Sequence, residues 1–431
     1  MNSRNKLIKI ITELSRIIVG VTFVFSGFVK AVDPLGFTYK IQDYLISFNL
    51  TEFFPLALPA AVILVVFEFL IGAFLLLGIY RKPTVILAAV FMAFFLPLTL
   101  WIALKNPVKD CGCFGDALII SNWETFYKNI VLGICAFVLL LYYKKITPLF
   151  SAKAARWAAI FLVIFGFAFA VYNVVELPVF DFRPFHIGAN IPENMYVDPT
   201  KADVVENVFI YSKDDVEQEF TEENYPWNDS TWTFVGMKTK VIKEGEKPKI
   251  EDFHIADLVT GEDITQQILS DANYNFLMVS YLLEEMSEKY LNDFKNTANF
   301  AENNGFNFYC ITSSSAHYIE KWSVKNNTDF RFAHADERML KTMIRANPGL
   351  MLLKNGNVIN MWNDSEIPDF DSKGVKNFAK TEGLKTNFWG KLMVILLIFL
   401  IPLLLLKLWD IRSTGKSNNT TVLCQVKSSE Y

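Results

Sequence analysis

The sequence is poor in histidine, cysteine and charged residues. Its 431 residues include 4 histidines and 5 cysteines, and 20% of them are charged. Because no two histidines lie four residues apart, a histidine-based metal site is not expected, and we predict no metal. So few cysteines in a chain of this length also exclude a disulfide-dense secreted scaffold.

The charge balance argues against a nucleic-acid partner. Lysine and arginine together number 41, aspartate and glutamate number 45, and the formal net charge is −4. Such a chain has no excess of basic side chains to neutralise the phosphates of DNA or RNA. We therefore expect no nucleic-acid partner.

Long apolar runs are what the chain has instead. Hydrophobic residues make up 52% of it, and they gather in residues 1–175 and again near the C-terminus. A helix that crosses a membrane needs about 20 mostly apolar residues. The sequence therefore predicts an α-helical transmembrane bundle of about six spans, surrounded by the lipid bilayer. The apolar segments are roughly 15–32, 56–79, 84–104, 126–143, 157–175 and 388–409.

Lysine and arginine are distributed unevenly between the two ends of these spans. The N-terminus and the segments after the second, fourth and sixth spans are basic, whereas the opposite segments mix lysine with acidic residues. Because basic residues gather on the cytoplasmic side, both termini are expected there. Residues 33–55, 105–125 and 178–385 then face outward. The first run could instead be a signal peptide, but it ends without a small-residue cleavage site, and we interpret it as an uncleaved span.

The first outward segment predicts a short helix. Asp33 and Pro34 form a helix-start signal, and apolar side chains follow them at helical spacing. Such a helix lies on the outer membrane face, where it either packs over the mouth of the bundle or gates a substrate. The apolar residues are Ile41, Tyr44, Leu45 and Phe48.

The chain divides into five parts. A membrane domain with five spans comes first, and a strand-rich linker region follows it outside the cytoplasm. An α/β domain comes next, before the sixth span and a cytoplasmic tail. The strand-rich region is indicated by runs such as Val208–Tyr211. The parts are 1–177, 178–250, 251–385, 386–409 and 410–431.

The α/β domain shows alternating strand and helix patterns. A strand at 275–281, a helix at 283–303 and a strand at 306–312 predict a parallel β-α-β unit. An Asn-Gly pair at 355–356 then predicts an antiparallel hairpin. A helix at about 371–382 is expected to close the domain.

The outward loop before the fourth span carries the candidate chemistry. Cys111 and Cys113 are separated only by Gly112, on the side of the membrane where disulfides form and persist. A disulfide between them would close a very small ring, so we expect it to be strained and readily exchanged. A structural pair that does not react is the main alternative. A zinc site is less suitable, because no second cysteine pair or histidine cluster accompanies this one.

One acidic residue lies inside the apolar runs. Glu68 stands in the middle of the second predicted span, where a carboxylate costs at least ~2.5 kcal/mol. It is either a group that handles protons or a quinone, or a structural hydrogen-bonding group. Lys30 is expected to extend toward the outer membrane interface. The remaining cysteines are not expected to react, because Cys135 and Cys310 lie in apolar runs and Cys424 lies in the cytoplasmic tail.

The membrane domain resembles a known family. The segments Cys-Gly-Cys-Phe-Gly-Asp at 111–116 and Phe-Ser-Gly-Phe-x-Lys at 25–30, with Glu68 and Gly72, are similar to methylamine utilisation protein MauE and the wider DoxX-like membrane proteins. The resemblance covers about residues 8–145. It implies a bacterial inner (plasma) membrane protein with a role like that in methylamine utilisation, which forms disulfides in, or matures, a periplasmic amine-oxidising partner. More distantly, it implies quinone-coupled thiol chemistry of the vitamin K epoxide reductase type.

The α/β domain resembles thioredoxin-like domains of the membrane-anchored, cytochrome-maturation type. Asn347-Pro348 stands just before the hairpin, where that fold has its cis-proline. The reactive Cys-x-x-Cys of that fold follows the first core strand, but Tyr281–Glu284 contain no cysteine here. The resemblance therefore implies a degenerate domain that lacks a nucleophile and binds a protein partner.

Two functions are compatible with the sequence. The first is thiol-disulfide redox or maturation work on extracytoplasmic partners, with Cys111 and Cys113 as the exchanging pair, Glu68 as the proton or quinone group and a quinone as electron acceptor. The second is a non-enzymatic membrane anchor or assembly factor whose thioredoxin-like domain binds a partner. A transporter is disfavoured, because intramembrane charges are few and no repeat relates two halves of the chain.

Overall fold

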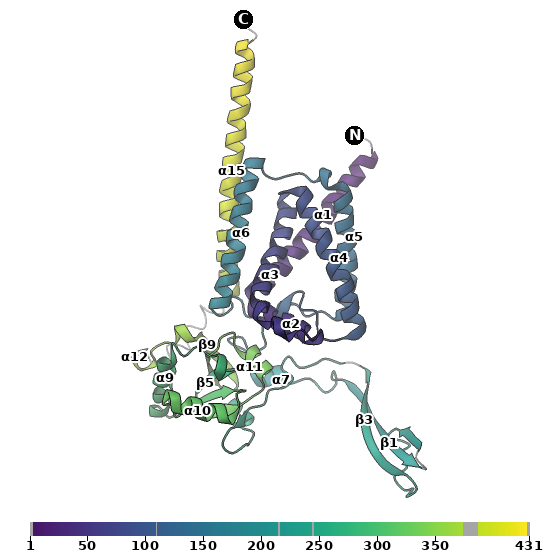
Figure 1. Ribbon diagram of the computed structural model, residues 1–431, viewed down its shortest axis with the longest axis vertical. Coiled ribbons are helices and arrows are strands. Elements are labelled where there is room, and N and C mark those ends of the chain that lie inside the picture. The colour runs from purple at the N-terminus through teal and green to yellow at the C-terminus, as the bar shows by residue number, and fades with distance from the viewer. Residues whose placement is uncertain (1–2, 109, 214–215, 244, 374–386, 429–431) are drawn as a thin grey trace.

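The computed structural model describes residues 3–108, 110–213, 216–243, 245–373 and 387–428. Its long helices form a bundle with an α/β domain beneath one end, and a small sheet stands apart from both (Figure 1). The N-terminal end of α1 (Ser3–Val32) and the C-terminal end of α15 (Phe388–Ser428) lie at the opposite end of the bundle (Figure 1).

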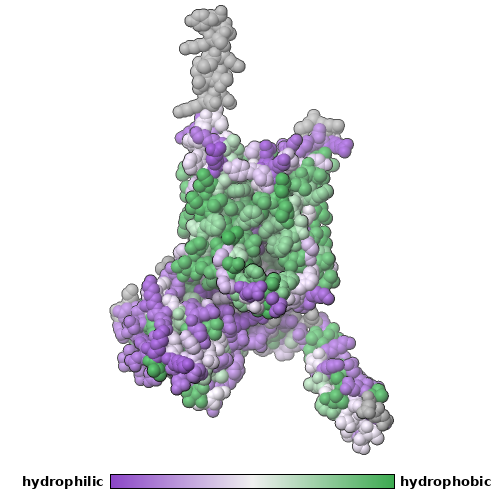
Figure 2. Space-filling view, viewed as in Figure 1, coloured by the Kyte–Doolittle hydropathy of each residue, from purple (hydrophilic) through white to green (hydrophobic). Residues whose placement is uncertain are grey.

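Within the part of the chain that the structure describes, five helices are long and apolar enough to cross a membrane. They include α3 (Phe54–Leu77), α4 (Arg81–Lys105), α5 (Asn122–Tyr142), α6 (Ala152–Val175) and α15. Hydrophobic side chains form a belt around these helices, and polar side chains lie at both ends of the belt (Figure 2). The apolar helices therefore place this region in a lipid environment.

Helix α1 is not one of these five, although its 30 residues run alongside them. Its close contact with α3 depends on glycines. A Cβ at Gly27 would lie 2.5 Å from the backbone nitrogen of Phe69, and one at Gly72 would lie 2.6 Å from that of Val24. The buried side of α1 also carries polar residues, which are Thr12, Ser15, Ser26 and Lys30. A total of six spans, with α1 as the first, stays a prediction.

The short helix predicted after Asp33 is confirmed as α2 (Pro34–Ser47). The Asp33 carboxylate caps it by accepting a hydrogen bond from the Gly36 N–H at 2.8 Å, and Pro34 occupies its first turn. In Figure 1, α2 lies across the end of the bundle that is nearest to the α/β domain. The helix therefore lies between the membrane helices and that domain.

The α/β domain is built on one mixed sheet with the strand order β4-β7-β6-β5-β8-β9. β5, β6 and β7 run parallel to one another, and β8 and β9 form the antiparallel hairpin that the Asn-Gly pair predicts. The strands are β4 (Ala256–Asp257), β5 (Asn275–Ser280), β6 (Asn307–Thr312), β7 (Arg331–His334), β8 (Gly349–Lys354) and β9 (Asn357–Asn363).

Helices cover both faces of this sheet. Alternate residues of β5 point to opposite sides, so Phe276 belongs to the core under α9 and α10, whereas Leu277 belongs to the core with α8 and α11. α11 also faces the membrane domain and contacts α2 there. These helices are α8 (Thr265–Ser270), α9 (Leu291–Asn303), α10 (Ala316–Asn326) and α11 (Glu337–Met343).

The helix predicted over 283–303 is wrong in its first part. The structure has a single 3₁₀ turn at Leu283–Glu285, and α9 begins only at Leu291. The intervening chain is held away from the helix because the Ser287 N–H donates to the Asn347 carbonyl at 3.1 Å. The predicted closing helix is described only as α12 (Phe370–Lys373), and the rest of 371–382 lies outside the described residues.

The strand-rich region contains a separate antiparallel sheet with the order β2-β1-β3. Its strands are β1 (Val204–Lys213), β2 (Val216–Phe220) and β3 (Thr233–Lys243), and most of their side chains are exposed. A short helix, α7 (Ile191–Met195), lies between α6 and this sheet in the chain. This sheet has little core of its own, in contrast to the sheet of the α/β domain.

Candidate functional site

Cys111 and Cys113 lie in the segment that joins α4 to α5, which we call the Cys loop (Asp110–Asp116). Both are free thiols, and their Sγ atoms are 2.9 Å apart. Gly112 between them has φ +68°, a conformation that glycine adopts without steric cost. The structure therefore brings the two predicted redox residues together in one tight turn.

Two neighbouring helices hold this turn in place. The Asp110 carboxylate accepts hydrogen bonds from the Gly112 N–H at 2.8 Å and from the Lys40 ammonium of α2 at 2.7 Å. The Tyr44 hydroxyl, also on α2, donates to the Cys111 carbonyl at 3.1 Å. The Ser26 hydroxyl of α1 donates to the carbonyl of Cys113 at 2.5 Å. Helices α1 and α2 thus fix the backbone of both cysteines.

The two thiols differ in their affinity for a proton. A hydrogen bond from the Cys111 thiol lowers the pKa of Cys113 to about 6, and the positive charges of Lys128 and Lys30 act in the same direction. The same interaction, together with burial, raises the pKa of Cys111. A thiol pair that shares one proton in this way holds a thiolate at neutral pH, which is the nucleophilic form of cysteine. Cys113, half-buried, is also more accessible than Cys111, which is 7% exposed.

Glu68 lies within electrostatic reach of this pair, inside the bundle. Its carboxylate forms a buried ion pair with the Lys30 ammonium, and the residues are only 6% exposed. The expectation that Lys30 extends to the outer interface is therefore wrong. A lysine that stays buried needs a counter-charge to offset the loss of water, and Glu68 supplies it. The ammonium also lies 5.0 Å from the centre of the Phe37 ring.

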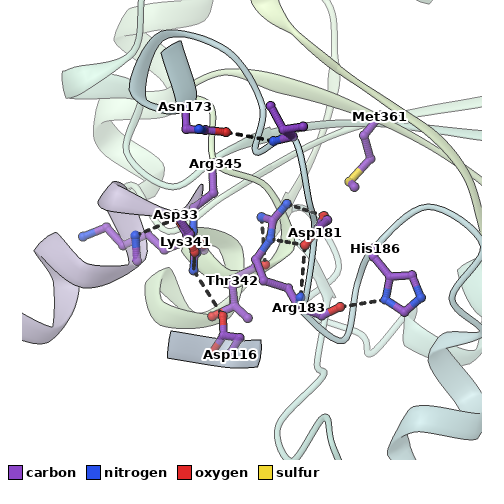
Figure 3. Close-up of polar contacts among 12 residues, drawn as sticks. Asp33, Asp116, Asn173, Asp181, Arg183, His186, Lys341, Thr342, Arg345 and Met361 are labelled. Carbon is purple, nitrogen blue, oxygen red and sulfur yellow. Dashed lines mark hydrogen bonds and ion pairs between the residues drawn. The ribbon is translucent and has the colours of Figure 1, made fainter. Parts of the chain in front are cut away.

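A second group of charged residues lies where the α/β domain meets the membrane domain, and we call it the junction cluster (Figure 3). Arg345, two residues after the end of α11, forms a 2.8 Å ion pair with Asp33 and lies 3.8 Å from Asp116 of the Cys loop. Although burial alone raises the pKa of Asp33, the Arg345 guanidinium outweighs it and holds that pKa below its usual value. The cluster consists of Asp33, Asp116, Asp181, Arg183 and Arg345.

Arg183 completes the junction cluster from the linker that follows α6. Its guanidinium binds the Asp181 carboxylate through Nε at 2.8 Å and Nη2 at 2.6 Å, and it donates to the Thr342 carbonyl of α11 at 3.3 Å. The side chain is 2% exposed. Bidentate pairs of this kind fix orientation as well as distance. The cluster therefore ties α2, the Cys loop, the linker and α11 to one another.

A cavity of about 590 Å³ opens beside these charges, and we call it the junction cavity. Its walls come from α2, from the Cys loop, from the linker 178–183 and from α11. Gly112 of the Cys loop and Lys30 of α1 both line it. The sequence patterns predict α2 and the Cys loop separately, but they give no sign that the α/β domain encloses a space against both.

The other candidate positions are not assembled into a thiol site. Cys310 is fully buried in β6, and burial raises its pKa, as expected for an unreactive core residue. Tyr281–Glu284 follow β5 and supply no thiol there. Cys135 lies on α5, away from the Cys loop, and Cys424 lies outside the residues whose side chains are described. In the described ranges, no group of three or more His, Cys, Asp or Glu side chains is arranged to hold a metal ion.

Comparison with known proteins identifies two segments. Residues 8–142 match the family described as methylamine utilisation protein MauE, and residues 205–244 match a domain of unknown function, DUF8463. No curated protein and no solved structure matches the chain. The first match covers about a third of the chain and includes α1 to α5 with the Cys loop. The N-terminal region is therefore a MauE-like membrane domain, and the apolar helices indicate a multi-pass membrane protein.

Proposed function

We propose that this protein is a membrane-bound thiol-disulfide exchange protein that acts on partner proteins outside the cytoplasm. The observation that carries the proposal is the pairing of Cys111 with Cys113, 2.9 Å apart and with opposite pKa shifts. A stabilised thiolate favours the reduced pair over its disulfide, so the disulfide is a good oxidant. This chemistry suits a role in disulfide formation or maturation, as the likeness to MauE implies.

The exchange proceeds in two steps that conserve electrons. A partner thiolate attacks the Cys113 sulfur of the Cys111–Cys113 disulfide, forms a mixed disulfide and releases Cys111, which takes up a proton. A second partner thiolate then attacks the partner's own sulfur and releases Cys113 as the thiolate. The partner gains a disulfide and loses two electrons, and the pair gains both. Cys113 is the proposed point of attack because it is the less buried residue of the two.

The reduced pair must pass its two electrons to an acceptor. We propose a lipid-soluble quinone as this second substrate, which takes up two electrons and two protons to become a quinol. The support for a quinone is the family resemblance and the burial of Glu68 near the pair. Glu68 is proposed to transfer protons at this stage, because a carboxylate held inside the bundle can accept and release them without contact with bulk water.

The orientation of the chain is part of the proposal. The free ends of α1 and α15 lie at one end of the bundle, and the Cys loop and the α/β domain lie at the other (Figure 1). Basic residues gather at the end with the termini, which favours that end as cytoplasmic. The Cys loop and residues 178–385 then face the outside of a bacterial inner membrane, where thiol oxidation is possible.

The α/β domain is proposed to be a thioredoxin-type domain without redox activity. Three observations support this identity: the parallel β5–β6 pair, the antiparallel β8–β9 hairpin beside β5, and the cis bond between Asn347 and Pro348. The residues after β5 offer no thiolate, so the domain's proposed task is to hold a partner protein over the Cys loop.

A second candidate is a non-enzymatic membrane anchor or assembly factor. It is favoured by the burial of Cys111 and by the absence of cysteine from Tyr281–Glu284. In that case the Cys pair is structural, and the α/β domain binds a partner without any exchange. The redox behaviour of the pair separates the two candidates.

The deciding experiment uses the full chain with Cys111→Ser. In this variant the Cys113 thiolate can attack the disulfide of an oxidised partner, which forms a mixed disulfide and releases one partner thiolate. Serine at position 111 cannot displace the bound partner, so the adduct should accumulate until a reductant releases it for identification by mass spectrometry. Cys135→Ser is the matched control, because it removes a cysteine of the bundle and leaves the pair intact. A pair that stays fully reduced in the wild type, with no adduct in Cys111→Ser, would contradict the redox proposal and favour the anchor.

A further inference from the structure

The junction cavity combines walls from parts of the chain that are far apart in sequence. α2 and the Cys loop form its membrane side, and Arg338, Lys341 and Thr342 of the α11 region form the opposite side. Cavities of several hundred Å³ are the usual size for binding a ligand of drug size. At about 590 Å³, the cavity holds a few residues of extended chain, but not a folded domain.

Every cation that lines the cavity is paired with a carboxylate. Each of its six lining cations has a carboxylate partner, as in the Lys40–Asp110 pair at 2.7 Å and the Arg338–Asp43 pair at 2.9 Å. Asp336 and Asp116 add further carboxylates, so no excess positive charge is left to bind a phosphate or another anion. The six cations are Lys30, Lys40, Arg183, Arg338, Lys341 and Arg345.

Paired charges of this kind suit a neutral ligand with many hydrogen-bonding groups. Carboxylates accept from peptide N–H groups, and ammonium and guanidinium groups donate to peptide C=O groups. Apolar side chains line the same space and can contact the side chains of the ligand. These include Phe37, Ile46, Phe54, Phe180 and Phe182. A polypeptide main chain with mixed side chains meets all of these conditions.

The cavity also adjoins the reactive pair. Gly112, which separates the two cysteines, is part of its wall, together with Asp110, Gly115 and Asp116. The Lys40 stem covers Gly112, since a Cβ on that glycine would lie 3.2 Å from the Lys40 Cγ. A chain that lies in the cavity is therefore next to Gly112, between the two cysteines, although the cysteines themselves are not part of the cavity wall.

We propose that the junction cavity is the binding site for an unfolded, extended segment of an exported protein that carries the thiols to be exchanged. This inference deepens the proposed function and rests on it. The α/β domain closes one side of the cavity, so the segment is held between that domain and the membrane surface. A folded substrate is excluded by size, which restricts the protein to partners that have not completed folding.

The test separates binding from redox chemistry. The full-length Cys111→Ser/Cys113→Ser variant carries a photoreactive benzoylphenylalanine in place of Gln42 in the cavity wall. The probe is carboxamidomethylated insulin B chain, an unfolded peptide without free thiols. We expect a light-dependent adduct with this probe and none with folded ubiquitin. The same photoreactive residue at Ile63, which is 56% exposed on α3, should give no adduct.

A cavity-filling variant strengthens the test. Ile46→Trp adds bulk to the wall and should lower capture of the B chain about tenfold, which corresponds to ~1.4 kcal/mol. Val90→Trp, at a position 61% exposed on α4, is the control and should leave capture unchanged. Equal capture from Gln42 and Ile63, or full capture in Ile46→Trp, would overturn the inference.

The outcomes distinguish this inference from the proposed function. Capture of the B chain, with no adduct at Cys113 in the trapping experiment, would leave the binding site in place and remove the redox role. Thiol-disulfide exchange at the Cys pair without capture of the B chain at Gln42 would leave the redox role in place and remove the proposed binding site. Capture of ubiquitin as well as the B chain would contradict the restriction to unfolded segments.

Discussion

Arg345 and Asp33 form a partly buried ion pair although they lie 312 positions apart in the chain. The Arg345 Nε lies 2.9 Å from each carboxylate oxygen of Asp33, and the arginine side chain is 5% exposed. Asp33 also caps α2, so the same carboxylate stabilises the start of that helix and binds Arg345 of the α/β domain. The position of the α/β domain over the Cys loop is therefore coupled to the folding of α2.

Breaking this pair should loosen the α/β domain. In Arg345→Met, Asp33 keeps its charge without its partner. Breaking a fully buried ion pair costs ~3–5 kcal/mol, and this pair should cost part of that, because the Asp33 side chain is 21% exposed. We expect faster hydrogen exchange in α2 and in the linker 178–183, measured by mass spectrometry on the full chain. Arg338→Met is the control, because its pair with Asp43 involves an arginine side chain that is 70% exposed and should contribute ~0–1 kcal/mol. Equal effects in both variants would show that the Arg345 pair does not hold the domain.

The pH dependence of Cys113 alkylation should reveal the hydrogen bond that Cys113 accepts from Cys111. With a pKa of about 6, its thiolate fraction falls as the pH falls through 6 and is nearly complete above pH 7. Alkylation should therefore be half-maximal near pH 6 in a chain whose Cys135, Cys310 and Cys424 are serines. Cys111→Ala removes the donor and should raise this midpoint, whereas Cys111→Ser keeps a hydroxyl donor and should raise it less. A midpoint that stays the same in Cys111→Ala would contradict the role of the hydrogen bond.

Local patterns predict the elements of the fold well, because the residues that specify them are close in sequence. Asp33 and Pro34 indicate the start of α2, and the Asn-Gly pair indicates the β8–β9 hairpin. The helix expected from 283 fails for a tertiary reason. The chain there hydrogen-bonds to Asn347, a residue that no local pattern connects with it.

The candidate site is predictable only in part for the same reason. Cysteine spacing identifies Cys111 and Cys113, and the unusual position of a carboxylate in a span identifies Glu68. The partner of Glu68 does not follow from spacing, since Lys30 stands near the C-terminal end of α1, where a lysine side chain is expected to reach water. No sequence pattern identifies Arg345 either, because its role depends on contact between the α/β domain and the membrane domain.

Replacement of Glu68 should separate a proton-carrying role from a structural one. Glu68→Gln leaves the Lys30 ammonium buried without a counter-charge, so slow reoxidation of the Cys pair in this variant has two possible causes. Lys30→Met/Glu68→Gln removes the stranded charge and keeps the loss of the carboxylate. We expect reoxidation, followed by stopped-flow thiol quantification in membranes, to be slow in both. Recovery of the wild-type rate in the double variant would assign Glu68 a purely structural role.

The orientation of the chain can be tested by labelling intact cells. A thiol reagent that cannot cross membranes should modify Cys113 after mild reduction, because the Cys loop is proposed to face outward. It should not modify Cys424 until the cells are permeabilised, and permeabilised cells provide the positive control. Labelling of Cys424 in intact cells would contradict the assignment of both termini to the cytoplasm and, with it, the count of six spans.

The last prediction assigns all thiol chemistry to the membrane domain. A dithiol site in a thioredoxin-type domain needs a thiolate at the start of a helix, where the positive end of the helix dipole lowers its pKa. Tyr281–Glu284 occupy that place and contain none, and burial raises the pKa of Cys310, the one cysteine in the described part of the α/β domain. The full-length Cys111→Ser/Cys113→Ser variant should therefore neither oxidise dithiols nor reduce insulin, whereas Cys310→Ser should retain the wild-type activity. Activity that survives in the double variant and disappears when Cys310→Ser is added would move the chemistry into the α/β domain and contradict the proposal.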